Sequence, residues 1–374
     1  MFLRKKRVLL LSEGFGSGHT QAAQALSMGL RQLSKNITTR VLELGAFQHP
    51  TIAPWIFSAY RKTVTNKPNL VGKLYQSYNK SSMSRLSSLA LHRLFYSRTA
   101  NIIRQLRPDL IISTHPFPTV IVSRLKRAGL STPLCTVITD YDAHGSWVDL
   151  EVNYYMVSTS EVKNKLIQRG ISSDVIQITG IPVHPKFWEI PNREESRLSF
   201  KLQDMPTVLV MGGGWGLIDD EEMMNYIAQW RDKIQLIFCT GNNEKVLHKL
   251  SEDERFKHPN IHLFGFTKDI NKLMDVSDLL ITKPGGMTCT EAMSKGIPML
   301  FYSPIPGQEE ENRQYFIENG FGEEIQSIAT IAAWFNKLLS DQYPLLLQNR
   351  INNQLNIKYS PQFCTESIIE LFQL

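Results

Sequence analysis

The chain has 374 residues, enough for about two domains, and its 42% hydrophobic and 20% charged residues exclude a disordered or fibrous protein. The net charge of +6 is unevenly spread, because residues 1–190 carry 24 Lys or Arg against 10 Asp or Glu, whereas residues 191–374 carry 17 against 25. The two halves are therefore expected to face different partners.

The sequence shows no signal of a secreted or membrane-spanning protein. It contains no run of about 18 or more apolar residues, and the apolar segment after the basic residues 4–7 is too short for a secretory signal. The four cysteines are scattered without the spacing of a disulfide framework or a zinc site. We therefore expect a protein of the cytoplasm.

The chain opens with a strand, expected at residues 7–12, followed by the glycine-rich loop EGFGSGH (residues 13–19) and a helix. This order begins an α/β fold. The third glycine of a dinucleotide-binding loop is due at position 19, where His19 stands instead. Glu43, near the end of the second expected strand, is placed to hold a ribose, so a dinucleotide site is disfavoured but stays open.

His19 is expected in the first turn of this helix, where the positive end of the helix dipole lowers its pKa and keeps the imidazole neutral. A neutral histidine beside a glycine-rich loop is suited to act as a general base. The alternative is a histidine that only forms a local hydrogen bond. We predict the base, and we expect Asp140 to be either a rival base or the partner that orients His19.

Residues 49–106 break the alternation of strands and helices and are expected to form a basic helical insert. No Asp or Glu occurs between positions 44 and 108, and helix-like patterns cover residues 55–60 and 84–95. Basic residues interleaved with aromatic ones suit an anionic membrane or a nucleic acid, and a solvated basic face is the plain alternative. We predict membrane contact for Trp55, Tyr60, Arg61, Lys62, Lys73, Tyr75, Arg85 and Arg93.

Two later strands, expected at residues 108–113 and 134–139, end in loops rich in polar and aromatic residues. Ligands bind at the carboxyl ends of parallel strands, so several loop side chains should gather near His19. No pair among them has metal-ligand spacing on a helix, and no metal is expected. The side chains in question are His115, Asp140, Asp142, His144 and Trp147.

The second half begins with another strand, glycine-rich loop and helix, at residues 207–216, after an exit from the first domain at residues 180–185. Two such openings predict two Rossmann-like domains that face each other across a cleft. Further strands are expected at residues 234–239 and 261–265. Their loops supply the candidate ligand-binding residues Gly213, Gly214, Thr240, Gly241, Asn242 and Phe266.

A turn between a strand and a helix, at residues 278–291, predicts a phosphate site. The strand at residues 279–282 ends at a proline, two glycines let a ligand approach the backbone, and a helix expected to begin near Thr288 offers its free N–H groups. Glu291 fits this site if its carboxylate accepts hydrogen bonds from ribose hydroxyls. The alternative is a capping box, in which Thr288 and Glu291 only close the start of the helix.

The loop after the last expected strand, residues 297–303, carries Gln308, Glu309 and Asn312. These side chains are suited to bind the hydroxyls of a hexose. An acidic helix start favoured by the helix dipole explains the glutamates at positions 309–311, but not Gln308 or Asn312. Diphosphate, ribose and hexose sites together indicate a nucleotide-sugar site.

Six motifs carry a resemblance to the monogalactosyldiacylglycerol synthase and processive diacylglycerol glucosyltransferase family. The resemblance extends over nearly the whole chain, and it reaches more distantly to the N-acetylglucosaminyltransferase of peptidoglycan synthesis. The motifs are LSEGFGSGHTQAA (11–23), TDYDAH (139–144), TGIPV (179–183), GF (265–266), KPGGMTCTEA (283–292) and PGQEEEN (306–312).

The resemblance implies the GT-B form of the α/β fold and an inverting transfer of glucose or galactose from a UDP-sugar to diacylglycerol. It implies no cofactor and no metal, with the UDP-sugar as co-substrate and anionic lipid as an activator. By the same resemblance Phe266 would read uracil through its backbone, Glu291 would bind the ribose, and Glu309 with Asn312 would bind the hexose. The remaining UDP-sugar contacts would come from Gly18, Gly285, Gly286, Met287 and Thr288.

The expected domains are residues 1–185 for the lipid acceptor and the membrane, 186–355 for the UDP-sugar, and 356–374 as a helix that returns to the first domain. His144 and Trp147 are assigned to the acceptor. The expected location is the inner face of the cell membrane, with peripheral attachment and no nucleic acid as partner. Transfer to an isoprenoid-linked cell-wall intermediate stays open as an alternative, and nucleic-acid binding as a remote one.

Overall fold

The computed structural model describes residues 4–66, 89, 93, 96–189, 192–214, 216, 220–355 and 360–374. They divide into two compact units. Unit 1 comprises Met1–Trp188, Ile305–Glu311 and Tyr359–Leu374, and unit 2 comprises Glu189–Pro304 and Asn312–Lys358. Each unit has its own sheet and core, and each is described by itself.

Unit 1 is built on a parallel six-stranded sheet in the order β2-β1-β3-β4-β5-β6. Strands buried on both faces are typical of parallel sheets, and β3 and β4 are buried at every residue. The strands are β1 (Lys6–Ser12), β2 (Ile37–Glu43), β3 (Leu110–Ser113), β4 (Leu134–Val137), β5 (Tyr154–Val157) and β6 (Ile176–Ile178).

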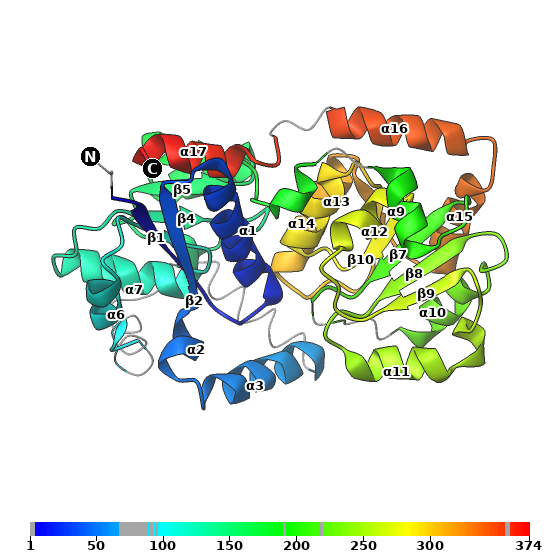
Figure 1. Ribbon diagram of the computed structural model, residues 1–374, viewed down its shortest axis with the longest axis horizontal. Coiled ribbons are helices and arrows are strands. Elements are labelled where there is room, and N and C mark those ends of the chain that lie inside the picture. The colour runs from blue at the N-terminus through cyan, green and yellow to red at the C-terminus, as the bar shows by residue number, and fades with distance from the viewer. Residues whose placement is uncertain are drawn as a thin grey trace. The chain divides into compact units, whose positions relative to one another are not determined.

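Helices cover both faces of this sheet (Figure 1). One core contains Leu26 and Leu30 of the first helix together with Cys364 and Ile368 of the last one, so the end of the chain packs on its beginning. The helices of unit 1 are α1 (Ser17–Leu33), α2 (Leu44–Gln48), α3 (Ala53–Asn66), α6 (Thr99–Leu106), α7 (Pro116–Arg127), α8 (Ser160–Gln168) and α17 (Phe363–Phe372), with short 3-10 turns at Gly145–Trp147, Ser173–Val175 and Pro185–Phe187.

The insert has a helix where one was predicted. Residues 55–60 fall inside α3, which is longer at both ends than the pattern suggested. The second predicted helix, residues 84–95, lies largely outside the described residues, of which positions 89 and 93 are helical. Among the described residues, no helix has both the length and the apolar character needed to cross a bilayer.

Unit 2 repeats the parallel arrangement in the order β12-β11-β10-β7-β8-β9. Every residue of β7, β8 and β10 is buried, which is why these segments are nearly continuous apolar runs in the sequence. The strands are β7 (Thr207–Met211), β8 (Gln235–Cys239), β9 (Ile261–Phe264), β10 (Leu279–Thr282), β11 (Met299–Phe301) and β12 (Gly322–Glu324).

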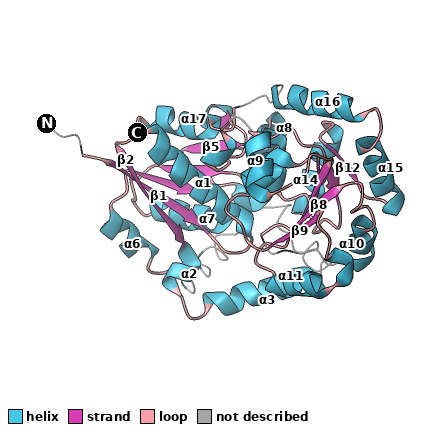
Figure 2. Cartoon of the chain, turned by 45° about the vertical axis from the view of Figure 1, so that its right-hand side comes forward, coloured by secondary structure: helices cyan, strands magenta, loops and turns pink. Residues whose placement is uncertain are grey.

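Helices also flank the sheet of unit 2 (Figure 2). The strand β12 and several of these helices were not predicted. The helices are α9 (Arg193–Phe200), α10 (Glu221–Ala228), α11 (Glu244–Glu252), α12 (Ile270–Val276), α13 (Gly286–Ser294), α14 (Gln308–Glu318), α15 (Ile328–Leu338) and α16 (Tyr343–Leu355), with a 3-10 turn at Glu254–Phe256.

Candidate active site

Histidines meet where the central strands of unit 1 end. The rings of His19, in the first turn of α1, and His115, the N-cap of α7, have centroids 4.7 Å apart and stand at 85° to each other. Nδ1 of His115 accepts the backbone N–H of Phe117 at 3.1 Å, so a neutral His115 carries its proton on Nε2. His144 lies in the loop after β4, as predicted for a side chain near His19.

His19 has the properties of a neutral base. Burial lowers its pKa to about 4, although part of the residue stays accessible. The pKa of His19 is lowered, as predicted, but the main cause is removal of the ring from water rather than the helix dipole. Nδ1 of His19 lies 2.7 Å from Oγ1 of Thr139. If Nδ1 donates this hydrogen bond, Nε2 is left as the proton acceptor.

Thr139 therefore contacts His19 in an orienting role of the kind that was predicted for Asp140. The Thr139 side chain is 3% exposed and follows β4, 120 positions from His19 in the sequence. Asp140 is also buried, and its carbonyl accepts the hydroxyl of Ser158 at 2.8 Å. The residue type and the position at a strand end were the only sequence signals for Thr139, and neither singles it out.

Glu43, which left a dinucleotide site open, has a structural partner. Its carboxylate accepts the hydroxyl of Thr20 at 2.7 Å. Thr20 follows His19 in α1, so this bond ties the end of β2 to the first helix. The ribose-binding role considered for Glu43 is not needed to explain the residue.

Aromatic side chains line the space around the histidines. The ring of Phe15, in the glycine-rich loop, makes edge contacts with two rings of α3. The centroid distances are 5.1 Å to Phe57 and 5.3 Å to Tyr60. It also contacts Phe117 at 5.6 Å and His115 at 6.0 Å. Tyr60 was predicted to touch the membrane, but it packs half-buried against the loop instead. The result is an apolar setting beside the candidate base, which suits an acceptor with hydrocarbon chains.

Trp147 does not have the exposed position that an acceptor or membrane contact requires. Its side chain is 0% exposed and belongs to the core of unit 1. The indole lies 6.1 Å from the ring of His19 and 6.0 Å from that of His144, measured between centroids. Trp147 therefore supports the histidines from inside the fold, and its assignment to the acceptor was wrong.

Large apolar side chains are exposed on α2 and at the start of the insert that follows it. Trp55 of α3 is 79% exposed, Ile52 is 53% exposed and Phe47 of α2 is 48% exposed. Lys62 is exposed beside them on α3, and Arg93 is exposed farther along the insert. Apolar and basic side chains together are typical of a surface that rests on a bilayer. Of the other predicted membrane residues, Arg61 is half-buried, and Lys73, Tyr75 and Arg85 lie outside the described residues.

In unit 2 the turn after β10 has the form expected of an anion site. Helix α13 begins at Gly286 with Gly285 as its N-cap, and no side chain caps it. The first backbone N–H groups, those of Gly286, Met287 and Thr288, have no acceptor within the helix. Because α13 begins two residues earlier than predicted, Thr288 is already inside the helix. The capping-box interpretation is therefore wrong.

Glu291 is buried in α13 with 8% of its surface exposed. Removal from water raises its pKa to about 8, with no other large cause. A buried carboxyl group of this kind gains stability from hydrogen-bond donors brought by a ligand. The hydroxyls of a ribose are such donors, so the structure is compatible with the predicted role.

The loops after β7 and β8 interlock. A side chain at Gly241 would meet the carbonyl oxygen of Gly213 at 2.7 Å, and Gly241 has a φ of +54°. The backbone N–H of Asn242 donates to the carbonyl of Gly214 at 3.2 Å. Thr240 was expected to reach a ligand, but it is fully buried and its hydroxyl donates to the carbonyl of Phe264 at 3.3 Å.

Phe266, predicted to read uracil through its backbone, follows β9 and has a side chain that is 62% exposed. The predicted hexose residues lie at the start of α14. Glu309 accepts the backbone N–H of Ile305 at 2.7 Å, so one carboxylate oxygen shapes the preceding loop. Gln308 is partly exposed and Asn312 is 1% exposed.

The two units each have the parallel α/β sheet of the GT-B fold. MurG of Acinetobacter baumannii has the same fold, with a TM-score of 0.56, 16% identity, and 98% of this chain and 99% of that one covered. So does Anabaena Alr3699/HepE, solved in complex with UDP and glucose, with a TM-score of 0.56, 13% identity, and 98% and 99% covered.

Sequence comparison narrows the class. A family model for monogalactosyldiacylglycerol (MGDG) synthase matches residues 19–183, and one for glycosyl transferases group 1 matches residues 222–356. The processive diacylglycerol β-glucosyltransferase of Staphylococcus epidermidis is 31% identical over 329 residues, which cover 86% of this chain and 82% of that protein. The chain belongs to the family of the processive diacylglycerol β-glucosyltransferases.

Proposed function

We propose that this protein transfers glucose from UDP-glucose to the free hydroxyl of diacylglycerol, with inversion at the anomeric carbon. The glucosyl group and the diacylglycerol acceptor are those in the relative's name, the Anabaena structure holds UDP and glucose, and the apolar side chains around His19 suit a lipid alcohol. The observation that carries the proposal is the neutral His19, which Thr139 contacts at the carboxyl ends of the strands of unit 1. A general base at this point is what direct displacement by an alcohol requires.

In the proposed reaction Nε2 of His19 removes the proton of the diacylglycerol hydroxyl as its oxygen attacks the anomeric carbon. The hydrogen bond between Nδ1 and Thr139 fixes the ring, and Trp147 and His115 hold it from the sides. The charge that develops on UDP is stabilised by the backbone N–H groups and the dipole at the start of α13. Asp140 stays a rival base in this proposal.

The test is to supply dioleoylglycerol with UDP-glucose or UDP-galactose separately, with and without EDTA, and to identify the lipid products. We expect glucosyl-diacylglycerol, with its formation unchanged by EDTA because α13 itself offsets the charge of the diphosphate. A parallel reaction with an undecaprenyl-linked acceptor tests the alternative that the protein transfers sugar to a cell-wall intermediate. Preference for UDP-galactose, or for the undecaprenyl acceptor, would overturn the proposed substrates.

We further propose that the apolar and basic surface of the insert attaches the protein to the inner, anionic face of the cell membrane. Replacing Trp55 with Ser should weaken binding to anionic vesicles by about tenfold or more, because a buried Trp side chain contributes roughly 2 kcal/mol. The measurement is co-sedimentation with vesicles at several salt concentrations. Leu198→Ser is the matched control, because Leu198 is equally exposed, at 79%, but lies in α9 of unit 2.

A second prediction concerns Glu291 and the donor. If ribose hydroxyls donate to the Glu291 carboxylate, binding of UDP-glucose at pH 7 must ionise a group whose pKa in the free protein is about 8. Calorimetry in buffers of different ionisation enthalpy should then detect the release of close to one proton per UDP-glucose bound. Glu291→Gln should abolish this release and weaken binding. Equal proton release in the variant would show that Glu291 does not bind the ribose.

A further inference from the structure

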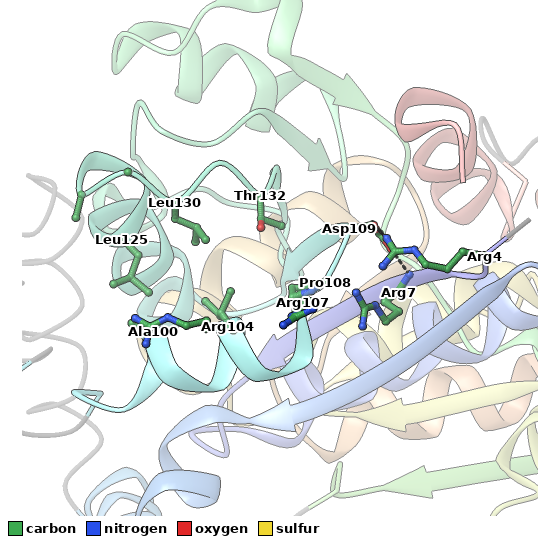
Figure 3. A pocket seen from close by; sticks show the side chains of 13 residues that line it. Arg4, Arg7, Ala100, Arg104, Arg107, Pro108, Asp109, Leu125, Leu130 and Thr132 are labelled. Carbon is green, nitrogen blue, oxygen red and sulfur yellow. Dashed lines mark hydrogen bonds and ion pairs between the residues drawn. The ribbon is translucent and has the colours of Figure 1, made fainter.

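A pocket of about 700 Å³ lies at the amino edge of the sheet of unit 1 (Figure 3). Its walls come from the start of β1, the residues before β3, helix α6, and the end of α7 with the loop that follows it. The strands are parallel, so this edge is opposite to the one that carries His19. The volume lies within the usual range of ligand sites. The pocket is therefore separate from the candidate active site.

Four arginines line this pocket, and only one carboxylate does. That carboxylate is engaged, because Asp109 forms an ion pair with Arg4 and accepts the backbone N–H of Arg7 at 2.8 Å. Among the described residues no carboxylate pairs with Arg7, Arg104 or Arg107, and Nε of Arg7 is buried without a hydrogen-bond partner. Three guanidinium groups thus share one pocket without a counter-charge.

The plain alternative is that these arginines only complement the negative ends of two helices. Both α6, which ends at Leu106, and α7, which ends at Arg127, finish at this edge. Each helix end carries about half of a negative charge. Two helix ends offset about one of the three guanidinium charges, so a positive charge of about two remains in the pocket.

The pocket also has an apolar wall. Ile103 of α6 and Leu125 and Leu130 near the end of α7 line it. In Figure 3, Arg104, Arg107 and Arg7 follow one another along the pocket, and Leu125 and Leu130 lie on its other side. An anion that uses both walls must carry its charge at one end and an apolar group at the other.

We propose that this pocket binds a phosphate monoester whose organic part is apolar. A phosphate monoester dianion matches the remaining charge, and its three terminal oxygens can accept the planar donor pairs of several guanidinium groups. Arg107 stands in the left-handed region, with a φ of 46° and a ψ of 59°, at a position after a helix where glycine is the usual residue. Arg107 lines the pocket in this conformation, and glycine can replace it without straining the backbone.

The test is calorimetric titration of the full-length protein with hexyl phosphate. We expect saturable binding that weakens about tenfold in Arg107→Gly, because a charge-assisted pair of hydrogen bonds is lost. Glycine adopts the left-handed conformation freely, so the fold is preserved. Arg104→Gln, at an exposed helix position, should weaken binding in the same way. Arg31→Gln, an exposed arginine of α1 outside the pocket, should leave it unchanged.

Two further titrations identify the source of the ligand. Tighter binding of hexyl phosphate than of glycerol 3-phosphate, together with Arg107-dependent binding to vesicles that contain hexadecyl phosphate, assigns the pocket to a lipid headgroup. Tighter binding of hexyl phosphate without Arg107-dependent binding to these vesicles assigns it to a soluble apolar ester. Equal binding of the two soluble esters would overturn the apolar part of the proposal. Arg107→Gly should keep its glucosyl transfer in both cases. Failure of every ester to bind, or equal affinity in wild type, Arg107→Gly and Arg104→Gln, would overturn the proposal.

Discussion

Replacing His19 with Ala should lower kcat for glucosyl transfer by about 10² to 10⁴, the range that a positioned general base contributes. The affinity of the variant for UDP-glucose should not change, because most of the residues proposed to contact UDP lie in unit 2. Product formation and UDP-glucose binding must therefore be measured on the same preparation. His248→Ala is the control, because His248 is an exposed histidine of α11. An equal loss of transfer and of donor binding would make His19 a binding or structural residue.

Thr139 allows a finer test of the same arrangement. Thr139→Val keeps the shape of the buried side chain but removes the hydroxyl that contacts Nδ1 of His19 at 2.7 Å. Transfer should fall by less than in His19→Ala, and Thr139→Ser should restore most of it. With the pKa of His19 at about 4, the base is lost only as the pH falls toward 4, so kcat at saturating UDP-glucose should not decline near pH 6.5 on the acid side. A decline of kcat near pH 6.5 would contradict a base whose pKa is lowered by burial.

Replacing Arg350 with Met should lower the free energy of unfolding by about 3 kcal/mol or more. Arg350 of α16 is buried, and its guanidinium donates to four backbone carbonyls. Nε donates to Lys295 at 3.0 Å and Nη1 to Ser277 at 2.7 Å, while Nη2 donates to Met274 at 3.1 Å and Asp275 at 3.0 Å. Without the arginine, these carbonyls at the ends of α12 and α13 lose their partners.

Urea unfolding of the full chain, followed by tryptophan fluorescence, measures this loss. Lys233→Met is the control, because Lys233 is an exposed basic residue of the same unit and its replacement should change stability by less than about 0.5 kcal/mol. Since α13 carries the proposed diphosphate site, Arg350→Met should also weaken UDP-glucose binding in the fraction that stays folded. A variant as stable as the wild type would show that the four hydrogen bonds contribute nothing net.

The sequence allowed the fold class to be predicted because its strongest patterns are local. Buried parallel strands such as β7 and β10 are apolar runs that end in glycine-rich turns, and these patterns repeat in both halves of the chain. The position of His19 at such a turn followed directly. The membership of the chain in its family confirmed the resemblance that six local motifs had carried.

The contacts that were missed join distant parts of the chain. Thr139 meets His19 across 120 positions, and no sequence period links them. Trp147 has the amphipathic side chain of an interface residue, yet the core encloses it. Arg350 resembles an exposed arginine on an amphipathic helix, and only the tertiary fold reveals the carbonyls around it. The start of α13 was misjudged because Thr288 is a good cap by type, while Gly285 is the actual N-cap.

The most direct test of the proposed function is the structure of the glycolipid itself. Wild-type protein, UDP-glucose and dioleoylglycerol should be incubated together, and the purified product examined by proton NMR. Because UDP-glucose is an α-glycoside, direct displacement assisted by His19 predicts a β-linked glucosyl-diacylglycerol. An α-linked product, or consumption of UDP-glucose without any glucosyl-diacylglycerol, would contradict the proposal.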